Sequence, residues 1–281
     1  MASYILSAFT DEYKTSLEGQ LEALQRFDIG YTEVRHVNGK NVAALTENDI
    51  KELKKQLDGV GKRVSAIGSP LGKIKLDGDF EAHLETARHI FTYANLLGAD
   101  FIRVFSFYAP ENGDITTMKD EVIDRLGALL TLAKAHGVTL CHENEAKIFG
   151  DIPARCHMLL QHFKGELKCV FDMGNFVLEG VEPFAAYEML RDYIAYFHIK
   201  DALAAGAIVP PHHGEARIKE ILTAHSRFAK QDFFVSLEPH LQTFSGLNAL
   251  TSSTFENPYK YEDPQSAFAD AVLQFRKGLT V

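Results

Sequence analysis

The chain has 281 residues, of which 46% are hydrophobic, and it carries a formal net charge of −9 from 38 acidic and 29 basic residues. An acidic chain without basic blocks excludes nucleic acid as the main partner. No stretch approaches the ~20 apolar residues of a membrane span, and the N-terminus lacks the pattern of a signal peptide, so we expect a cytoplasmic protein with no membrane contact. The three cysteines, Cys141, Cys156 and Cys169, have no Cys-x-x-Cys spacing, and we expect buried, reduced thiols.

Strand and helix patterns alternate along the whole chain. Short apolar or aromatic runs predict strands at residues 4–9, 31–35, 63–67, 101–105, 138–142, 168–171, 195–199 and 233–237. Apolar side chains at helical spacing predict helices at residues 17–27, 46–57, 80–97 and 118–136, from a cap at 151–153 onward, and at 183–190, 216–228 and 265–277. Thr46 is expected to cap the second helix, and Gly98 and Gly137 to end the third and fourth.

Eight strands that alternate with eight helices are typical of parallel βαβ units, and eight such units close a barrel. The composition shows no break, so we predict a single α/β domain, a (β/α)8 TIM barrel, over residues 1–281. A doubly wound open sheet is the alternative. That fold favours a glycine-rich phosphate loop after the first strand, and residues 7–11 contain no glycine.

Four successive strands end on a carboxylate or an imidazole, namely Glu143, Asp172, His198 and Glu238. Active-site residues of these barrels lie at the carboxyl ends of the strands. Three carboxylates and one imidazole form a mostly oxygen shell, which suits one divalent ion, Mn²⁺, Mg²⁺ or Co²⁺, with Zn²⁺ also compatible. A single Asp or Glu after a strand is commonly a helix cap or a solvated loop charge, but four at consecutive strand ends predict a shared metal site.

The strand pleat offers a consistency check, because side chains two positions apart share a face. The residues two before the four predicted ligands should point into the barrel with them; they are Cys141, Val170, Tyr196 and Ser236. The residues one before should face the helices; they are His142, Phe171, Phe197 and Leu237. Three of these four are large and apolar, as a helix-facing side requires, and His142 is the exception that the pattern does not place.

Further polar residues are expected around a substrate. The second strand, residues 31–35, carries charge on one face, which indicates a polar barrel mouth or else a surface edge strand. We predict substrate contacts from Glu33, Arg35, Arg103, Glu145, Asn175, Lys200, Arg217 and His240. Arg35, Arg103 and Lys200 could meet a phosphate or carboxylate of the substrate. They could instead form ion pairs with the nearby acids Glu33, Glu145 or Asp201.

The strand ends also carry motifs. Residues 143–145 read Glu-Asn-Glu, 171–175 Phe-Asp-Met-Gly-Asn, 198–201 His-Ile-Lys-Asp and 237–240 Leu-Glu-Pro-His. Together they resemble the sugar phosphate isomerase/epimerase family of the xylose isomerase-like TIM-barrel superfamily, and the similarity covers nearly the whole chain. That superfamily includes ketose 3-epimerases, inosose dehydratases and endonuclease IV. The resemblance implies one divalent metal ion at the four strand ends and, as in the ketose epimerases, Glu143 and Glu238 as acid and base around a metal-stabilised cis-enediolate.

One position departs from the family pattern, because Asn175 stands where epimerases often have a histidine, and an amide cannot shuttle protons. The further strand-end histidines of endonuclease IV are not evident either. We therefore expect an isomerase or epimerase acting on a sugar or sugar phosphate. A metal-dependent lyase of the inosose dehydratase type and a non-catalytic sugar-binding barrel are the alternatives. The segment after the eighth strand, residues 240–264, could form a lid or a dimer contact, and both a homodimer and a homotetramer stay open.

Overall fold

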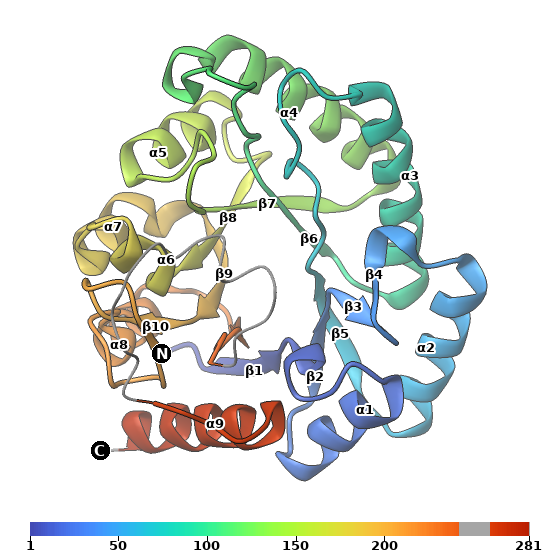
Figure 1. Ribbon diagram of the computed structural model, residues 1–281, viewed down its shortest axis with the longest axis vertical. Coiled ribbons are helices and arrows are strands. Elements are labelled where there is room, and N and C mark those ends of the chain that lie inside the picture. The colour runs from blue at the N-terminus through green and yellow to red at the C-terminus, as the bar shows by residue number, and fades with distance from the viewer. Residues whose placement is uncertain (242–258, 281) are drawn as a thin grey trace.

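Eight parallel strands form one sheet that curves into a barrel, with the helices outside it (Figure 1). The computed structural model describes residues 1–241 and 259–280. The barrel strands are β1 (Tyr4–Ala8), β2 (Tyr31–Val34), β5 (Arg63–Ile67), β6 (Phe101–Val104), β7 (Thr139–Glu143), β8 (Lys168–Asp172), β9 (Ile194–Ile199) and β12 (Phe233–Leu237). Their order in the sheet is β1-β12-β9-β8-β7-β6-β5-β2, so the predicted TIM barrel is confirmed.

The outer layer contains the helices α1 (Leu17–Arg26), α2 (Glu47–Gly59), α3 (Phe80–Leu97), α4 (Lys119–His136), α5 (Pro153–His162), α6 (Met173–Leu178), α7 (Pro183–Leu190), α8 (Ile218–Phe228) and α9 (Pro264–Thr280). Short 3-10 helices lie at Thr10–Glu12, Val42–Ala44, Ile115–Thr117 and Arg191–Tyr193. The loops contain two small antiparallel hairpins, formed by β3 (His36–Val37) with β4 (Lys40–Asn41) and by β10 (Asp201–Ala202) with β11 (Ile208–Val209).

Local signals set most helix ends. Thr46 caps α2 in a capping box with Asp49, and Gly98 and Gly137 end α3 and α4 in the left-handed conformation, as predicted. The prediction of a cap at 151–153 was partly wrong, because Pro153 opens α5 with no side-chain cap before it.

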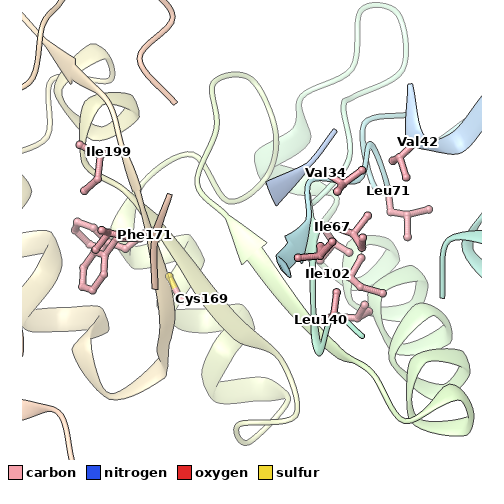
Figure 2. Packing of buried hydrophobic residues seen from close by; sticks show 14 of the residues in the cluster. Val34, Val42, Ile67, Leu71, Ile102, Leu140, Cys169, Phe171 and Ile199 are labelled. Carbon is pink, nitrogen blue, oxygen red and sulfur yellow. The ribbon is translucent and has the colours of Figure 1, made fainter. Parts of the chain in front are cut away.

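Side chains pack in two layers that follow the pleat. Inside the barrel, Ala66, Cys141, Val170 and Tyr196 form a small cluster. On the other face, Ile67, Ile102 and Leu140 lie side by side on β5, β6 and β7 and pack toward the helices (Figure 2). Phe171, Phe197 and Leu237 belong to this outer core, as the alternation predicted. The three cysteines are free and buried.

The barrel has a seam between β1 and β2, the two strands at the ends of the sheet order. In the described part of the chain, side-chain hydroxyls link these strands in place of a backbone ladder. The Thr32 hydroxyl donates to the Ala8 carbonyl oxygen at 3.2 Å. The Ser7 hydroxyl of β1 lies 2.7 Å from that of Ser65 on β5, and the Ser65 hydroxyl donates to the Thr32 carbonyl oxygen of β2 at 3.3 Å. Among the described residues, no helix is long and apolar enough to span a membrane.

Candidate metal centre

The four predicted ligands meet at the carboxyl end of the barrel. Glu143 and Asp172 are the last residues of β7 and β8, His198 is the fifth residue of β9, and Glu238 follows β12. One ligand atom from each lies within 4.8 Å of the others, and all four side chains are buried. Their strands are neighbours in the order β12-β9-β8-β7, so parallel register alone brings residues 95 positions apart in the sequence to one place.

His198 lies at the middle of this cluster. Its Nδ1 is 2.8 Å from Glu143 Oε1 and 3.2 Å from Glu238 Oε2, while its Nε2 is 3.1 Å from Glu33 Oε2. Burial alone would lower the pKa of His198, but the three carboxylates raise it well above its ordinary value. Without a bound ion, His198 is therefore an imidazolium that donates to glutamates on both sides.

Lys200, two residues after His198, donates hydrogen bonds to three acceptors of the site. Its Nζ donates to Asp172 Oδ2 at 2.9 Å, to Asn175 Oδ1 at 3.1 Å and to Glu238 Oε2 at 3.2 Å. Burial raises the pKa of Asp172 to about 7, although Lys200 acts against that rise. Burial also acts to raise the pKa of Glu238, but Lys200 and other nearby positive charge keep it well below its usual range.

Arg103 contacts both glutamates of the cluster. Its Nη1 lies 3.2 Å from Glu143 Oε2 and 3.5 Å from Glu238 Oε1, and its remaining nitrogens donate to the Ser69 and Gly68 carbonyl oxygens. Burial alone would raise the pKa of Glu143, but His198 and Arg103 bring it down to about 2. Both glutamates are therefore carboxylates at neutral pH.

Arg35 crosses the seam of the barrel. From the end of β2 it pairs with Asp11 and Glu12, which follow β1, and with Glu238, at 2.9, 3.2 and 3.0 Å. Phe9 supports this network from below, because its ring centroid lies 4.4 Å from the Arg35 guanidinium carbon and its ring meets His198 edge to face.

The donor set fits a divalent ion. Three carboxylates and one imidazole converge, and Glu143 Oε2 is a buried oxygen that accepts no hydrogen bond in the described structure. A second convergent group, Glu12, Glu238 and His240, shares Glu238 with the first, offers one ligand fewer and is less buried. The four-residue cluster is therefore the candidate metal centre.

The structure brings seven of the eight predicted substrate residues to this centre or to the cavity above it. They are Glu33, Arg35, Arg103, Glu145, Asn175, Lys200 and His240. Arg35, Arg103 and Lys200 do form ion pairs, but with other acids than those expected, mainly Glu238, Glu143 and Asp172. Arg217 is not brought in, because it pairs with Glu182 and Glu220 at the surface and caps α8 in a left-handed conformation.

Sequence reasoning missed Asn144, which holds Asp172 in place. Asn144 Nδ2 donates to the Asp172 carbonyl oxygen at 2.9 Å, and its Oδ1 accepts from the Asp172 N–H at 3.0 Å. Asn175 Nδ2 donates to the Asn144 carbonyl oxygen at 2.9 Å. Asp172 also caps α6, an element the sequence patterns did not predict, by accepting from the Asn175 N–H. An Asn directly after a strand is typical of a turn, so only its position next to Glu143 could have marked it.

His142, which the sequence did not place, faces away from the metal centre. Its Nε2 lies 3.0 Å from the Ser106 hydroxyl, and its ring packs against Gly150, where a Cβ would collide with it. Burial lowers the pKa of His142 to about 4, so it is neutral. It therefore fills the space under the loop after β7.

A cavity of about 640 Å³ opens beside Glu238. Its lining combines charged groups with apolar and aromatic ones: Asp11, Glu12, Tyr13, Arg35, Pro70, Lys73, Arg103, Tyr108, Glu145, Glu238, His240 and Phe268 are among them. Lys73, also missed from the sequence, donates to Glu145 Oε2 at 3.0 Å and lies 4.2 Å from the Phe105 ring centroid. A polar ligand of sugar size would fit above the candidate metal centre.

An eight-stranded parallel barrel with a cluster of carboxylate and imidazole groups at its carboxyl end defines the class of protein, a TIM barrel with a candidate metal centre. Residues 21–245 match the model of the xylose isomerase-like TIM barrel family, and the chain belongs to that family. None of the curated proteins compared with the sequence matches it.

Solved structures share the fold at low identity. An L-ribulose 3-epimerase is 18% identical with a TM-score of 0.72, covering 100% of this chain and 95% of that one. A xylose isomerase-like TIM barrel protein from Mycobacterium smegmatis in complex with magnesium is 16% identical with a TM-score of 0.70, covering 100% and 99%. The probable 3-DHS dehydratase AsbF from Bacillus anthracis is 19% identical with a TM-score of 0.68, covering 88% and 96%.

Proposed function

We propose that this protein is a divalent-metal-dependent enzyme that isomerises or epimerises a sugar through proton transfer next to its carbonyl group. One observation carries the proposal. Glu143 and Glu238 stand on the two outer strands of the arc β7-β8-β9-β12, with Asp172 and His198 between them. A sugar carbon above the centre would have a carboxylate on either side, as a two-base proton transfer requires.

The protein side chains would divide the work as follows. One glutamate, as its carboxylate, takes the proton from the carbon beside the carbonyl, and the electron pair moves onto the carbonyl oxygen to give an enediolate. The other glutamate takes a proton from solvent water and delivers it to the carbon, and the first glutamate then loses its proton to solvent. Both are carboxylates at neutral pH, the form that accepts a proton, because His198 and Arg103 lower the pKa of Glu143 and Lys200 and neighbouring imidazoles lower that of Glu238. A divalent ion at the four ligands would supply Lewis-acid polarisation of the carbonyl and the adjacent hydroxyl.

Asn175 limits the route of the proton. Its amide donates to the Asn144 carbonyl and accepts from Lys200, and an amide has no proton to give or take in this pH range. The proton transfers therefore fall to Glu143 and Glu238. Arg103, with a carboxylate from each on one Nη1, is placed to hold the two at a fixed separation.

Turnover in deuterated water tests the proposal. The metal-loaded protein is incubated with a panel of ketoses, and the products are examined by NMR and mass spectrometry. Deuterium at the carbon next to the carbonyl in an isomeric product is the expected result. Loss of water from the product would instead favour a dehydratase, the probable activity of the structural neighbour AsbF. No exchange with any ketose would leave a sugar-binding barrel.

Variants connect this activity with the site. Glu143→Gln and Glu238→Gln should each lower kcat by at least about 100-fold, the range for loss of a positioned acid or base. Arg217→Ala is the matched control, since Arg217 lies at the surface outside the cavity lining, and it should turn over normally. Normal turnover by both glutamine variants would refute the assignment of the acid–base pair.

A further inference from the structure

The positive charges nearest the candidate metal centre are already fully used. Lys200 has three N–H groups and three acceptors, from Asp172, Asn175 and Glu238, all within 3.2 Å. It is buried, as are all three of its partners. A substrate anion could contact Lys200 only by displacing one of these acceptors.

The two arginines are committed in the same way. Arg35 directs its Nε, Nη1 and Nη2 to Asp11, Glu238 and Glu12, respectively. Arg103 directs Nη1 toward two glutamates and its other two nitrogens to backbone carbonyl oxygens. Neither guanidinium presents an unused edge for the bidentate binding of phosphate or carboxylate.

At the rim of the cavity the lysines are also paired. Lys73 lies 3.0 Å from Glu145, and Lys14 lies 2.7 Å from Glu22. Residues 242–258 lie outside the described structure, but their sequence contains no lysine, arginine or histidine. That segment therefore has no cationic side chain to offer to a substrate.

The charge balance points the same way. In the described part of the chain, seven carboxylates surround the centre and its cavity: Asp11, Glu12, Glu33, Glu143, Glu145, Asp172 and Glu238. Five lysine and arginine side chains face them: Lys14, Arg35, Lys73, Arg103 and Lys200. This leaves two formal negative charges, which a dication at the four ligands would cancel. The loaded cavity would then be neutral and would hold no excess positive charge for an anionic substrate.

We propose that the cavity selects an uncharged sugar, a free ketose or a related polyol, and rejects the phosphate ester or the carboxylate of the same sugar. This inference rests on the proposed function and specifies its substrate class. Apart from the exposed Lys14–Glu22 pair at the rim, an anionic group would have to take a cation away from a largely buried carboxylate and leave that carboxylate unpaired, which is costly in a dry site. A neutral hydroxyl both donates and accepts, so it can join carboxylates and guanidinium groups without breaking their pairs.

Specificity constants test the proposal. The metal-loaded protein is assayed with fructose, tagatose and ribulose and with their terminal phosphate esters. We expect kcat/KM for the best free ketose to exceed that for its ester by at least about 100-fold, since loss of an ion pair's partner at a buried site is worth a factor of this size. A preference for the ester would overturn the inference and still support an isomerase.

A rim variant makes the cause testable. Glu145→Gln removes the partner of Lys73, so the ratio of kcat/KM for ester over free ketose should rise about tenfold, whatever happens to the absolute rates. Glu220→Gln is the matched control, because Glu220 pairs only with the surface Arg217 among the described ion pairs, and its ratio should equal that of the wild type. An unchanged ratio in Glu145→Gln would overturn the argument from committed cations.

Binding separates this inference from the proposed function. Glucitol and glucitol 6-phosphate have no carbonyl group and cannot be turned over, so calorimetric titration of each into metal-free and metal-loaded protein reports selection by charge alone. Tighter binding of glucitol in both forms supports the inference even if no ketose is converted. Tighter binding of the phosphate to the metal-free protein overturns it, whatever the enzyme assays give.

Discussion

Asn144 offers a sharp test of how the metal centre is built. Its side-chain amide makes a two-way link with the backbone N–H and C=O of Asp172, through bonds of 3.0 and 2.9 Å, and both residues are buried. Asn144→Ala removes both bonds and leaves the buried backbone N–H of Asp172 without its acceptor, while the Asp172 carbonyl keeps the first hydrogen bond of α6. Because an unsatisfied buried group costs about 1–3 kcal/mol, the variant should lose about 1–3 kcal/mol of unfolding free energy.

The same substitution should weaken metal binding. Asp172 would keep its carboxylate but lose the link that fixes its position relative to β7, and partners of this kind are worth about 10–100-fold in metal affinity. Urea unfolding of the metal-free protein measures the first effect, and calorimetric titration of Mn²⁺ measures the second. Both effects come from one pair of hydrogen bonds, so they should appear together.

Asn95→Ala is the matched control. Asn95 Nδ2 donates to the His136 carbonyl oxygen at 2.9 Å, but at an exposed helix end where water can replace it. This variant should cost about 1 kcal/mol or less and leave Mn²⁺ affinity unchanged. If Asn144→Ala unfolds within about 0.5 kcal/mol of the wild type and binds Mn²⁺ equally well, the link does not support the site and our reasoning is wrong.

Three further predictions follow from charge and burial. Metal affinity should rise with pH between 6 and 8, because His198, with its raised pKa, and Asp172, with a pKa of about 7, must lose protons to bind the ion. Calorimetric titrations in buffers of different ionisation enthalpy measure the protons released on binding. Equal binding heats in all buffers would contradict this prediction. Burial lowers the pKa of His83 to about 4, and its Nε2 accepts from the Gly72 N–H. Neutral His83 therefore contributes about 2 kcal/mol to the unfolding free energy above pH 6.5, and this contribution is lost as the pH falls toward 4. His83→Gln keeps an acceptor but does not titrate, so the unfolding free energy measured with urea should depend less on pH in this range. Arg217→Ala should leave Mn²⁺ affinity within twofold of the wild type, and a larger change would show that its surface ion pairs reach the centre.

The sequence was sufficient to predict the fold and the four convergent side chains, because the two-residue period of the strands determines both. Strand ends in a parallel barrel share one rim, and the pleat that sends Tyr196 inward also sends His198 inward. His142 broke the expected apolar pattern on the outer face, yet its side chain turns outward as the pleat requires. The position of a residue in the two-residue period of its strand therefore predicted the direction of its side chain better than its polarity did.

The remaining parts of the site depend on contacts that no local pattern encodes. Lys73 reaches Glu145 from 72 residues away, and Phe9 supports Arg35 across the seam. The helix α6 was missed because Met173-Gly174-Asn175 looks like a turn, and it forms where Asp172 caps it. Arg217 was grouped with the pocket residues but lies in surface ion pairs outside the cavity lining, because a basic residue in a loop after a strand does not reveal which side of the rim it faces.

The seam between β1 and β2 also has a consequence for the order of folding. Glu143, Asp172 and His198 lie on consecutive βα units and can meet once the middle of the barrel has formed. Glu238 joins them only through β12, and its bond with Arg35 spans 203 residues. Such distant pairings form late, because the entropy of a long loop must be lost before the contact contributes. Tight uptake of a metal ion by a refolding chain would therefore mark the moment when β12 pairs with β9 and brings Glu238 to the other three ligands.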